Sequence, residues 1–205
     1  MDVSPESPTL RVFVALAPPD DAKEELARAL QPAYTMYPGL RWNRIEDWHI
    51  TLAFLGELPR TAVPLLQSVL AGQAVSRPAL RLGLRGGGHF DGRLLWSGIG
   101  GDLEGLHLLA ADVRKLVRSC GIDFAERPLR PHLTLARSRR EDPVSVPRAA
   151  AGLAGFVGRP WPAERLHLVG SNIARGPGTI RYRDIEAWRF GTAARAADDS
   201  ASAGS

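Results

Sequence analysis

Short apolar runs alternate along this chain with longer segments in which apolar residues recur at helical spacing. The run at residues 11–16 has the nearly continuous apolar character of a central strand, and a second strand is predicted at 49–55. Between them, Asp20 is the predicted cap of a helix whose apolar positions continue to residue 30. Another helical stripe covers residues 63–70. The first half of the chain therefore predicts two strands, each followed by a helix.

The second half of the chain continues with the same kinds of element. Residues 80–84 and 94–99 are predicted to pair as a hairpin around the glycines at 86–88 and the Asp91-Gly92 turn. The elements predicted after the hairpin are a helix, a strand, a short helix and two closing strands, at residues 103–117, 131–136, 144–153, 166–169 and 180–187. Strands and helices are thus mixed, and hairpins favour antiparallel pairing, so the pattern predicts an α+β fold with two lobes of sheet and helix.

The ends of the chain differ from its middle. Residues 1–9 and 191–205 have no apolar period, and they are expected to be a loose N-terminus and a disordered C-terminal tail. Residues 10–190 are expected to fold as a single domain of two lobes.

Composition narrows the classes of protein to which the chain can belong. With 44% hydrophobic and 23% charged residues, the 205-residue chain has the composition of a globular protein. No stretch approaches the ~18 consecutive apolar residues of a membrane span, and the first eight residues do not resemble a signal peptide, so a cytoplasmic protein is expected. The single cysteine, Cys120, excludes an internal disulfide and any metal site built from several cysteines.

The charge balance favours an anionic partner. The formal net charge is +4, and all but two of the 26 basic residues are arginines, whose planar fork matches a phosphate. A GC-rich genome would produce the same excess of arginine. The positions of the arginines, rather than their number, therefore have to carry the argument.

One pentapeptide pattern occurs twice. The sequence HITLA begins at His49, and the sequence HLTLA begins 83 residues later at His132. Five histidines and seven threonines in 205 residues predict only about 0.17 His-x-Thr by chance, so two copies that also share Leu-Ala indicate an internal duplication.

The duplicated motif suggests a particular chemistry. In a strand, residues i and i+2 share a face, so each motif places its histidine and threonine together and its apolar residues on the core side. If the lobes are related by a pseudo-two-fold axis, the two pairs converge across a groove. One imidazole can then act as general base and the other as general acid, while the hydroxyls stabilise developing negative charge. In-line phosphoryl transfer needs this arrangement most. For a single copy, a structural histidine and a β-forming threonine would be the simpler interpretation.

These features resemble the 2H phosphoesterase superfamily. Besides the two His-x-Thr motifs, the likeness includes the Phe54-Leu55-Gly56 segment after the first motif, Arg130-Pro131 before the second and Arg137 after it. It extends over about residues 10–190 and is greatest to the RNA 2′,3′-cyclic phosphodiesterases, also called 2′-5′ RNA ligases. Trp48 stands where an aliphatic residue is more usual.

The resemblance implies a bilobal α+β fold, with two mostly antiparallel sheets and outer helices around a V-shaped groove. It also implies hydrolysis of a 2′,3′-cyclic phosphate to a 2′-phosphate, without a metal or other cofactor. His49 would be the general acid and His132 the general base. Thr51 and Thr134 would hold the non-bridging oxygens, and Arg137 would add positive charge at the phosphate. Pseudo-symmetry leaves the two histidine roles interchangeable from the sequence.

Residues beside the motifs are candidates for contacts with the rest of the substrate. Arg130 belongs to a dense group of arginines that is either a solvated loop or a track for backbone phosphates. Trp48 or Phe54 is a candidate to stack on a terminal base, although core packing is the alternative for a tryptophan. The dense group comprises Arg127, Arg130, Arg137, Arg139 and Arg140, and a basic and aromatic group before the first motif comprises Arg41, Trp42, Arg44 and Trp48.

Three functions are compatible with the motifs: hydrolysis of a terminal cyclic phosphate, 2′-5′ ligation of RNA by the same residues, and binding of RNA ends without catalysis. The presence of both histidines and both threonines favours catalysis, because binding alone does not require two proton-transfer groups. The expected partner is RNA with a terminal 2′,3′-cyclic phosphate, or a cyclic nucleotide. The protein is expected to be a monomer.

Overall fold

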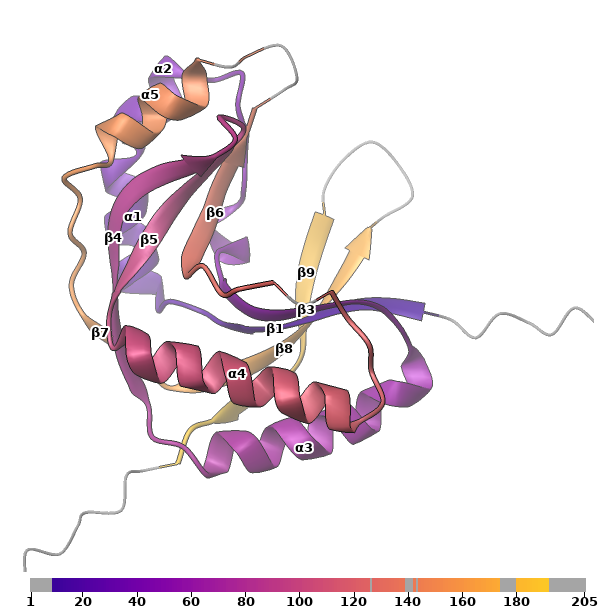
Figure 1. Cartoon of the computed structure of the whole chain (residues 1–205). Coiled ribbons are helices and arrows are strands. Elements are labelled where there is room, and N and C mark those ends of the chain that lie inside the picture. The colour runs from indigo at the N-terminus through magenta and orange to yellow at the C-terminus, as the bar shows by residue number, and fades with distance from the viewer. Residues whose placement is uncertain (1–8, 126, 139–141, 143, 174–179, 192–205) are drawn as a thin grey trace, which may run out of the picture.

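The computed structural model describes residues 9–125, 127–138, 142, 144–173 and 180–191 (Figure 1). Except for Thr9 and Gly191, the two termini that were expected to be loose lie outside the described residues, as do Arg139 and Arg140. Within the described part, the predicted α+β class is confirmed.

A single nine-stranded sheet runs through the described residues, in the order β7-β4-β5-β6-β3-β1-β8-β9, with the short β2 beside β6. The neighbouring strands pair antiparallel. The strands are β1 (Thr9–Leu16), β2 (Arg41–Trp42), β3 (Ile50–Pro59), β4 (Leu80–Phe90), β5 (Leu94–Gly101), β6 (His132–Arg137), β7 (Trp161–Ala163), β8 (Arg165–Ile173) and β9 (Ile180–Arg189).

The two lobes correspond to two halves of this sheet. One half contains β3, β1, β8 and β9, the other contains β7, β4, β5 and β6, and Figure 1 shows that their strands run in different directions. In the described residues, β3 of one half and β6 of the other are paired at one position, where Ile50 lies opposite Leu133. The two sheets expected from the sequence are therefore joined at a single point.

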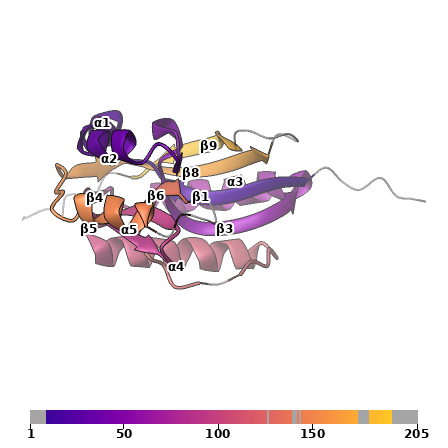
Figure 2. The same cartoon turned by 90° about the horizontal axis from the view of Figure 1, so that it is seen from above.

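Helices cover each half. The helices are α1 (Asp20–Ala29), α2 (Gln31–Met36), α3 (Val63–Val75), α4 (Leu103–Ser119) and α5 (Ser145–Gly152). Helices α3 and α4 pack against the half that contains β3, whereas α1 and α5 pack against the other half (Figure 2). Among the described helices, none is long and apolar enough to cross a membrane.

Two local predictions were wrong. Asp20 is the first helical residue rather than the cap, because the cap position is taken by Pro19 in an extended conformation. The glycines at 86–88 do not form a turn but lie inside β4, where Gly86 has φ 63° beside a register shift. At Gly88, a Cβ atom would collide with the indole of Trp96 on β5. Close approach of this ring therefore requires glycine.

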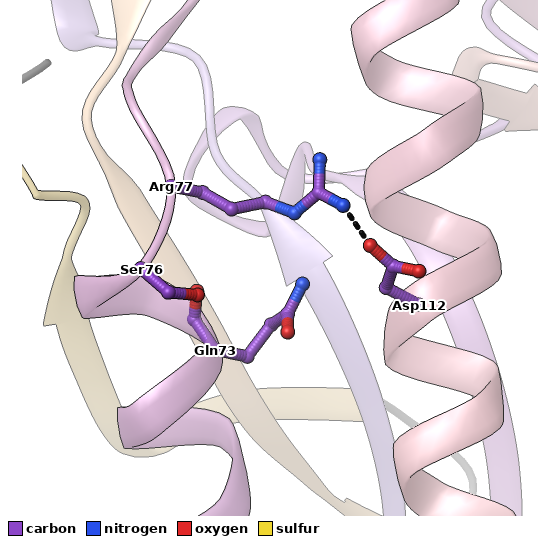
Figure 3. A network of polar contacts seen from close by, with 4 residues as sticks. All are labelled: Gln73, Ser76, Arg77 and Asp112. Atoms are coloured by element: carbon purple, nitrogen blue, oxygen red, sulfur yellow. Dashed lines mark hydrogen bonds and ion pairs between the residues drawn. The ribbon is translucent and has the colours of Figure 1, made fainter.

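The C-terminal end of α3 is joined to the middle of α4 by a polar contact (Figure 3). Arg77, just after α3, forms an ion pair and hydrogen bond with Asp112 of α4. At the same end of α3, the Ser76 hydroxyl donates to the carbonyl oxygen of Gln73 at 2.9 Å. The Arg77–Asp112 contact therefore links the two helices that cover the β3 half of the sheet, and the Ser76 bond closes the end of α3.

Replacing Leu66 with alanine is expected to lower the free energy of unfolding by about 2–5 kcal/mol, because this leucine of α3 is fully buried and its loss leaves a cavity. Its neighbour Leu65 is 53% exposed, so Leu65→Ala is expected to change stability by no more than about 0.5 kcal/mol. Urea unfolding followed by circular dichroism measures both. Equal losses would show that the buried face of α3 has been assigned wrongly.

Candidate active site

The two motifs lie side by side where the halves of the sheet meet. His49 immediately precedes β3, and His132 is the first residue of β6. The pair that joins the halves, Ile50 and Leu133, consists of the residue after each histidine. A two-fold axis through an antiparallel pair exchanges the two strands. The histidines therefore occupy equivalent positions on either side of the junction.

A pocket of about 460 Å³ opens over this junction. It brings together both histidines and both threonines of the motifs, and it also contains Phe54 and Arg137, which the sequence had singled out. The other residues that line it are Phe13, Arg41, Trp42, Asn43, Arg44, Asp47 and Tyr182.

Both imidazoles are held by the same type of hydrogen bond. Nδ1 of His49 lies 2.6 Å from the carbonyl oxygen of Asp47, and Nδ1 of His132 lies 2.6 Å from that of Arg130. A carbonyl oxygen only accepts, so Nδ1 must carry the hydrogen in each ring. In the neutral imidazole, Nε2 is then the atom that can take up a proton.

The surroundings of the two rings differ. His49 stacks on Phe13 with ring centroids 4.5 Å apart, and the edge of Tyr182 meets it at 5.1 Å. Burial lowers the pKa of His49 to about 4. His132 is in edge contact with Phe90 at 5.1 Å, and its pKa is lowered by burial and by the charge of Arg137. Both imidazoles are therefore neutral at pH 7.

Each motif strand contains a β-bulge at the same position. The register of β3 with β1 shifts at Leu52, and the register of β6 with β5 shifts at Leu135. An extra residue reverses the alternation of side chains beyond it. Phe54 and Arg137, each five positions after its histidine, consequently line the same pocket as the histidines instead of facing the core.

Two residues from outside the motifs donate hydrogen bonds to the carbonyl oxygens at and beside these bulges. Nε of Arg114 on α4 donates to the carbonyl of Leu52 at 3.0 Å. The backbone N–H of Asn43 donates to the carbonyl of Leu135 at 2.8 Å, and its side-chain amide donates to the carbonyl of Thr134 at 3.0 Å. Both bulges are thus held by hydrogen bonds to other parts of the chain.

Trp48 is not placed where the sequence suggested. Its side chain is 1% exposed and belongs to the main core, so the ring is not available to stack on a base. The cause is the alternation of an extended backbone, in which Trp48 and Ile50 point away from the face that carries His49.

Arg130 lies beside the pocket rather than in it. Its side chain is exposed and lines an adjoining groove, with the guanidinium 5.6 Å from the centre of the Phe90 ring. Its carbonyl oxygen is the acceptor for His132. The predicted role of Arg130 in a track for backbone phosphates therefore stays a prediction, and it concerns the adjoining groove rather than the catalytic pocket.

Sequence reasoning missed three residues at this site. Phe13 was predicted only as part of an apolar strand, and Tyr182 only as part of a closing strand, yet both pack on His49. Asn43 was passed over within a basic and aromatic group. The strand alternation held one clue, since Phe13 falls between the core residues Val12 and Val14 and must face the other side of the sheet.

The comparisons with known proteins agree with this geometry. A family model described as the 2′-5′ RNA ligase superfamily matches residues 18–172. The chain belongs to this superfamily. The resemblance recognised from the doubled motif is therefore confirmed.

Curated relatives of this superfamily member carry one name, RNA 2′,3′-cyclic phosphodiesterase. The protein of Geobacillus stearothermophilus is 32% identical over 180 residues, which cover 86% of this chain and 56% of that protein. The Escherichia coli protein is 29% identical over 179 residues, which cover 87% of this chain and 95% of that protein. The chain thus spans little more than half of the first relative and nearly all of the second.

Solved structures show the same fold. Escherichia coli LigT complexed with 3′-AMP has a TM-score of 0.72 and 28% identity, covering 89% of this chain and 99% of that one. A Thermus thermophilus structure has a TM-score of 0.74 and 25% identity, covering 90% of this chain and all of that one.

Asn43→Ala is expected to lower the free energy of unfolding by about 1–3 kcal/mol, because it leaves the carbonyl of Thr134 without its side-chain donor. Amide exchange in residues 132–137 is expected to become faster. Urea unfolding and hydrogen exchange by mass spectrometry measure the two effects. As a control, Gln67→Ala removes an exposed hydrogen bond that the Gln67 amide donates to the carboxylate of Glu186, and it is expected to change stability by less than about 0.5 kcal/mol. Unchanged exchange in β6 would contradict the role given to Asn43.

Proposed function

We propose that this protein hydrolyses 2′,3′-cyclic phosphates of RNA ends or nucleotides to 2′-phosphates, using the two His-x-Thr motifs. The observation that carries the proposal is the convergence of two equivalent histidine and threonine pairs, together with Arg137, around one pocket of about 460 Å³. Similarity to curated RNA 2′,3′-cyclic phosphodiesterases supports the class of reaction.

In this reaction a water oxygen attacks phosphorus while the bond from phosphorus to the 3′-oxygen breaks. One imidazole takes a proton from the water at Nε2, and the other imidazole gives a proton to the leaving 3′-oxygen. Thr51 and Thr134 donate hydrogen bonds to the non-bridging oxygens, and Arg137 balances the negative charge that develops on them. The products are a 2′-phosphate and a free 3′-hydroxyl.

The assignment of His132 as base and His49 as acid remains a prediction. In the free protein His49 is the harder of the two to protonate, because burial lowers its pKa to about 4. This assignment therefore requires the bound phosphate anion to raise the pKa of His49 substantially. The opposite assignment, with His49 as the base, does not require the pKa of His49 to rise before the reaction.

The proposal predicts that the wild type opens a short RNA ending in a 2′,3′-cyclic phosphate and leaves a 2′-phosphate, in the presence of EDTA. His49→Ala and His132→Ala are each expected to lower the rate by about 10²- to 10⁴-fold, since each removes one proton-transfer group. Chromatography against authentic 2′- and 3′-phosphate standards identifies the product. The control is His107→Ala, which removes an exposed histidine of α4 that does not line the pocket.

Loss of wild-type activity in EDTA, restored by a divalent metal, would overturn the metal-independent mechanism. A second activity is tested in the same way, because the family model names 2′-5′ RNA ligases. Paired RNA ends with a cyclic phosphate and a free 5′-hydroxyl would be joined if the same residues act in reverse. Binding of the RNA with the ring left closed would favour a module that binds without catalysis.

The pH dependence should reflect the two lowered pKa values. Catalysis needs one neutral and one protonated imidazole, and the pKa of each lies below 6.5 in the free protein. We expect kcat/KM to be maximal below pH 6.5 and to fall about tenfold per pH unit at higher pH, as the acid loses its proton. Initial rates between pH 4 and pH 9 measure this. A maximum above pH 7.5 would show that at least one histidine is not desolvated as described.

A further inference from the structure

A second groove continues from the catalytic pocket. Its volume is about 720 Å³, and it shares Thr51, Phe54 and His132 with the pocket. We propose that this arginine–phenylalanine groove binds the RNA strand on the 5′ side of the reacting phosphate. The proposal rests on the proposed function and specifies its substrate as an RNA strand rather than a free cyclic nucleotide. The lining residues that carry the argument, besides Phe54, are Phe90, Asp91, Arg114, Phe124, Arg127 and Arg130.

Charge separates this groove from the space on the opposite flank. Among its described lining residues the groove has three arginines and one carboxylate, Asp91. The opposite flank, which shares His49 and Tyr182 with the catalytic pocket, is lined by six carboxylates and only two basic side chains other than histidine, Lys23 and Arg165. The six carboxylates are Asp20, Asp21, Glu46, Asp47, Glu164 and Asp184. A strand that carries one negative charge per phosphate is attracted to the first flank and repelled by the second.

Aromatic rings are placed in the groove where bases could stack. Phe54 is 46% exposed, and Phe90 and Phe124 are half-buried. All three rings also lie beside guanidinium groups. Arg11 is 4.9 Å from the centre of Phe54, Arg130 is 5.6 Å from that of Phe90, and Arg118 is 5.3 Å from that of Phe124. Single-stranded RNA is held in this way, by aromatic stacking of bases together with arginines along the backbone. The opposite flank has a different character, because carboxylates dominate its lining.

The size and position of the groove suit a nucleotide. Pockets of about 300–1,000 Å³ accommodate ligands of this size. With the cyclic phosphate at the histidines, the terminal ribose directs its 5′-phosphate toward one flank. Among the described lining residues, arginines outnumber carboxylates in the arginine–phenylalanine groove, whereas carboxylates outnumber basic side chains on the opposite flank.

The test compares two substrates, a linear RNA trinucleotide that ends in a 2′,3′-cyclic phosphate and a 2′,3′-cyclic mononucleotide. The quantity measured is the kcat/KM value for the trinucleotide divided by that for the mononucleotide. The wild-type ratio is expected to be at least about ten, and Phe124→Ala is expected to lower it about tenfold, the effect of one lost base stack. Arg127→Ala is expected to lower the ratio several-fold and to reduce the slope of log kcat/KM against log salt by about 0.7 for the RNA. Thermal unfolding verifies that each variant is folded.

The matched control is Arg165→Ala, which removes the same charge from the opposite flank. It is expected to leave the ratio unchanged, whereas a nonspecific effect of net charge would alter Arg127→Ala and Arg165→Ala equally. A wild-type ratio near one, or a ratio that responds to Arg165 and not to Arg127 and Phe124, would overturn the strand groove while leaving the proposed function intact. Hydrolysis of neither substrate would instead overturn the proposed function.

Discussion

Matched β-bulges at Leu52 and Leu135 determine which side chains meet at the junction of the two half-sheets. A regular strand would turn the fifth residue after each histidine toward the core, and for Arg137 this would bury a charge at a large cost. The bulges instead bring Phe54 and Arg137 to the face that carries the histidines. Because Arg114 of α4 binds one bulge and Asn43, the residue after β2, binds the other, helix α4 and the segment that follows β2 are tied directly to the geometry of the pocket.

The duplicated site combines equal geometry with unequal environments. Each imidazole donates from Nδ1 to the carbonyl two residues earlier in the chain, so the same local hydrogen bond orients both rings. The environments differ because Phe13 and Tyr182 enclose His49, whereas His132 meets the edge of Phe90 near the charge of Arg137. Such a difference biases which imidazole carries the single proton that the pair shares during the reaction.

The sequence predicted the main strands, four of the five helices and the convergence of the two His-x-Thr pairs, because these depend on local periodicity and strand alternation. It did not predict the bulges, since a bulge depends on the register with a neighbouring strand. The two-residue strand β2 and the role of Asn43 were missed for the same reason. The place of Trp48, in contrast, could have been predicted from the sequence. Alternation along an extended backbone puts the residue before His49 on the opposite face, so the ring of Trp48 lies in the core.

The flanks of the pocket break the symmetry that the motifs share. The groove rich in arginine and phenylalanine contains His132, and the flank rich in carboxylates contains His49. A strand bound in the former places the terminal ribose, with its leaving 3′-oxygen, on the side of His132, so that an in-line water approaches from the side of His49. This orientation favours His49 as base and His132 as acid, the reverse of the roles predicted from the sequence. The pKa of about 4 at His49 agrees with it, because the imidazole that is harder to protonate stays neutral, as a base must, when the single proton of the pair is on the other ring.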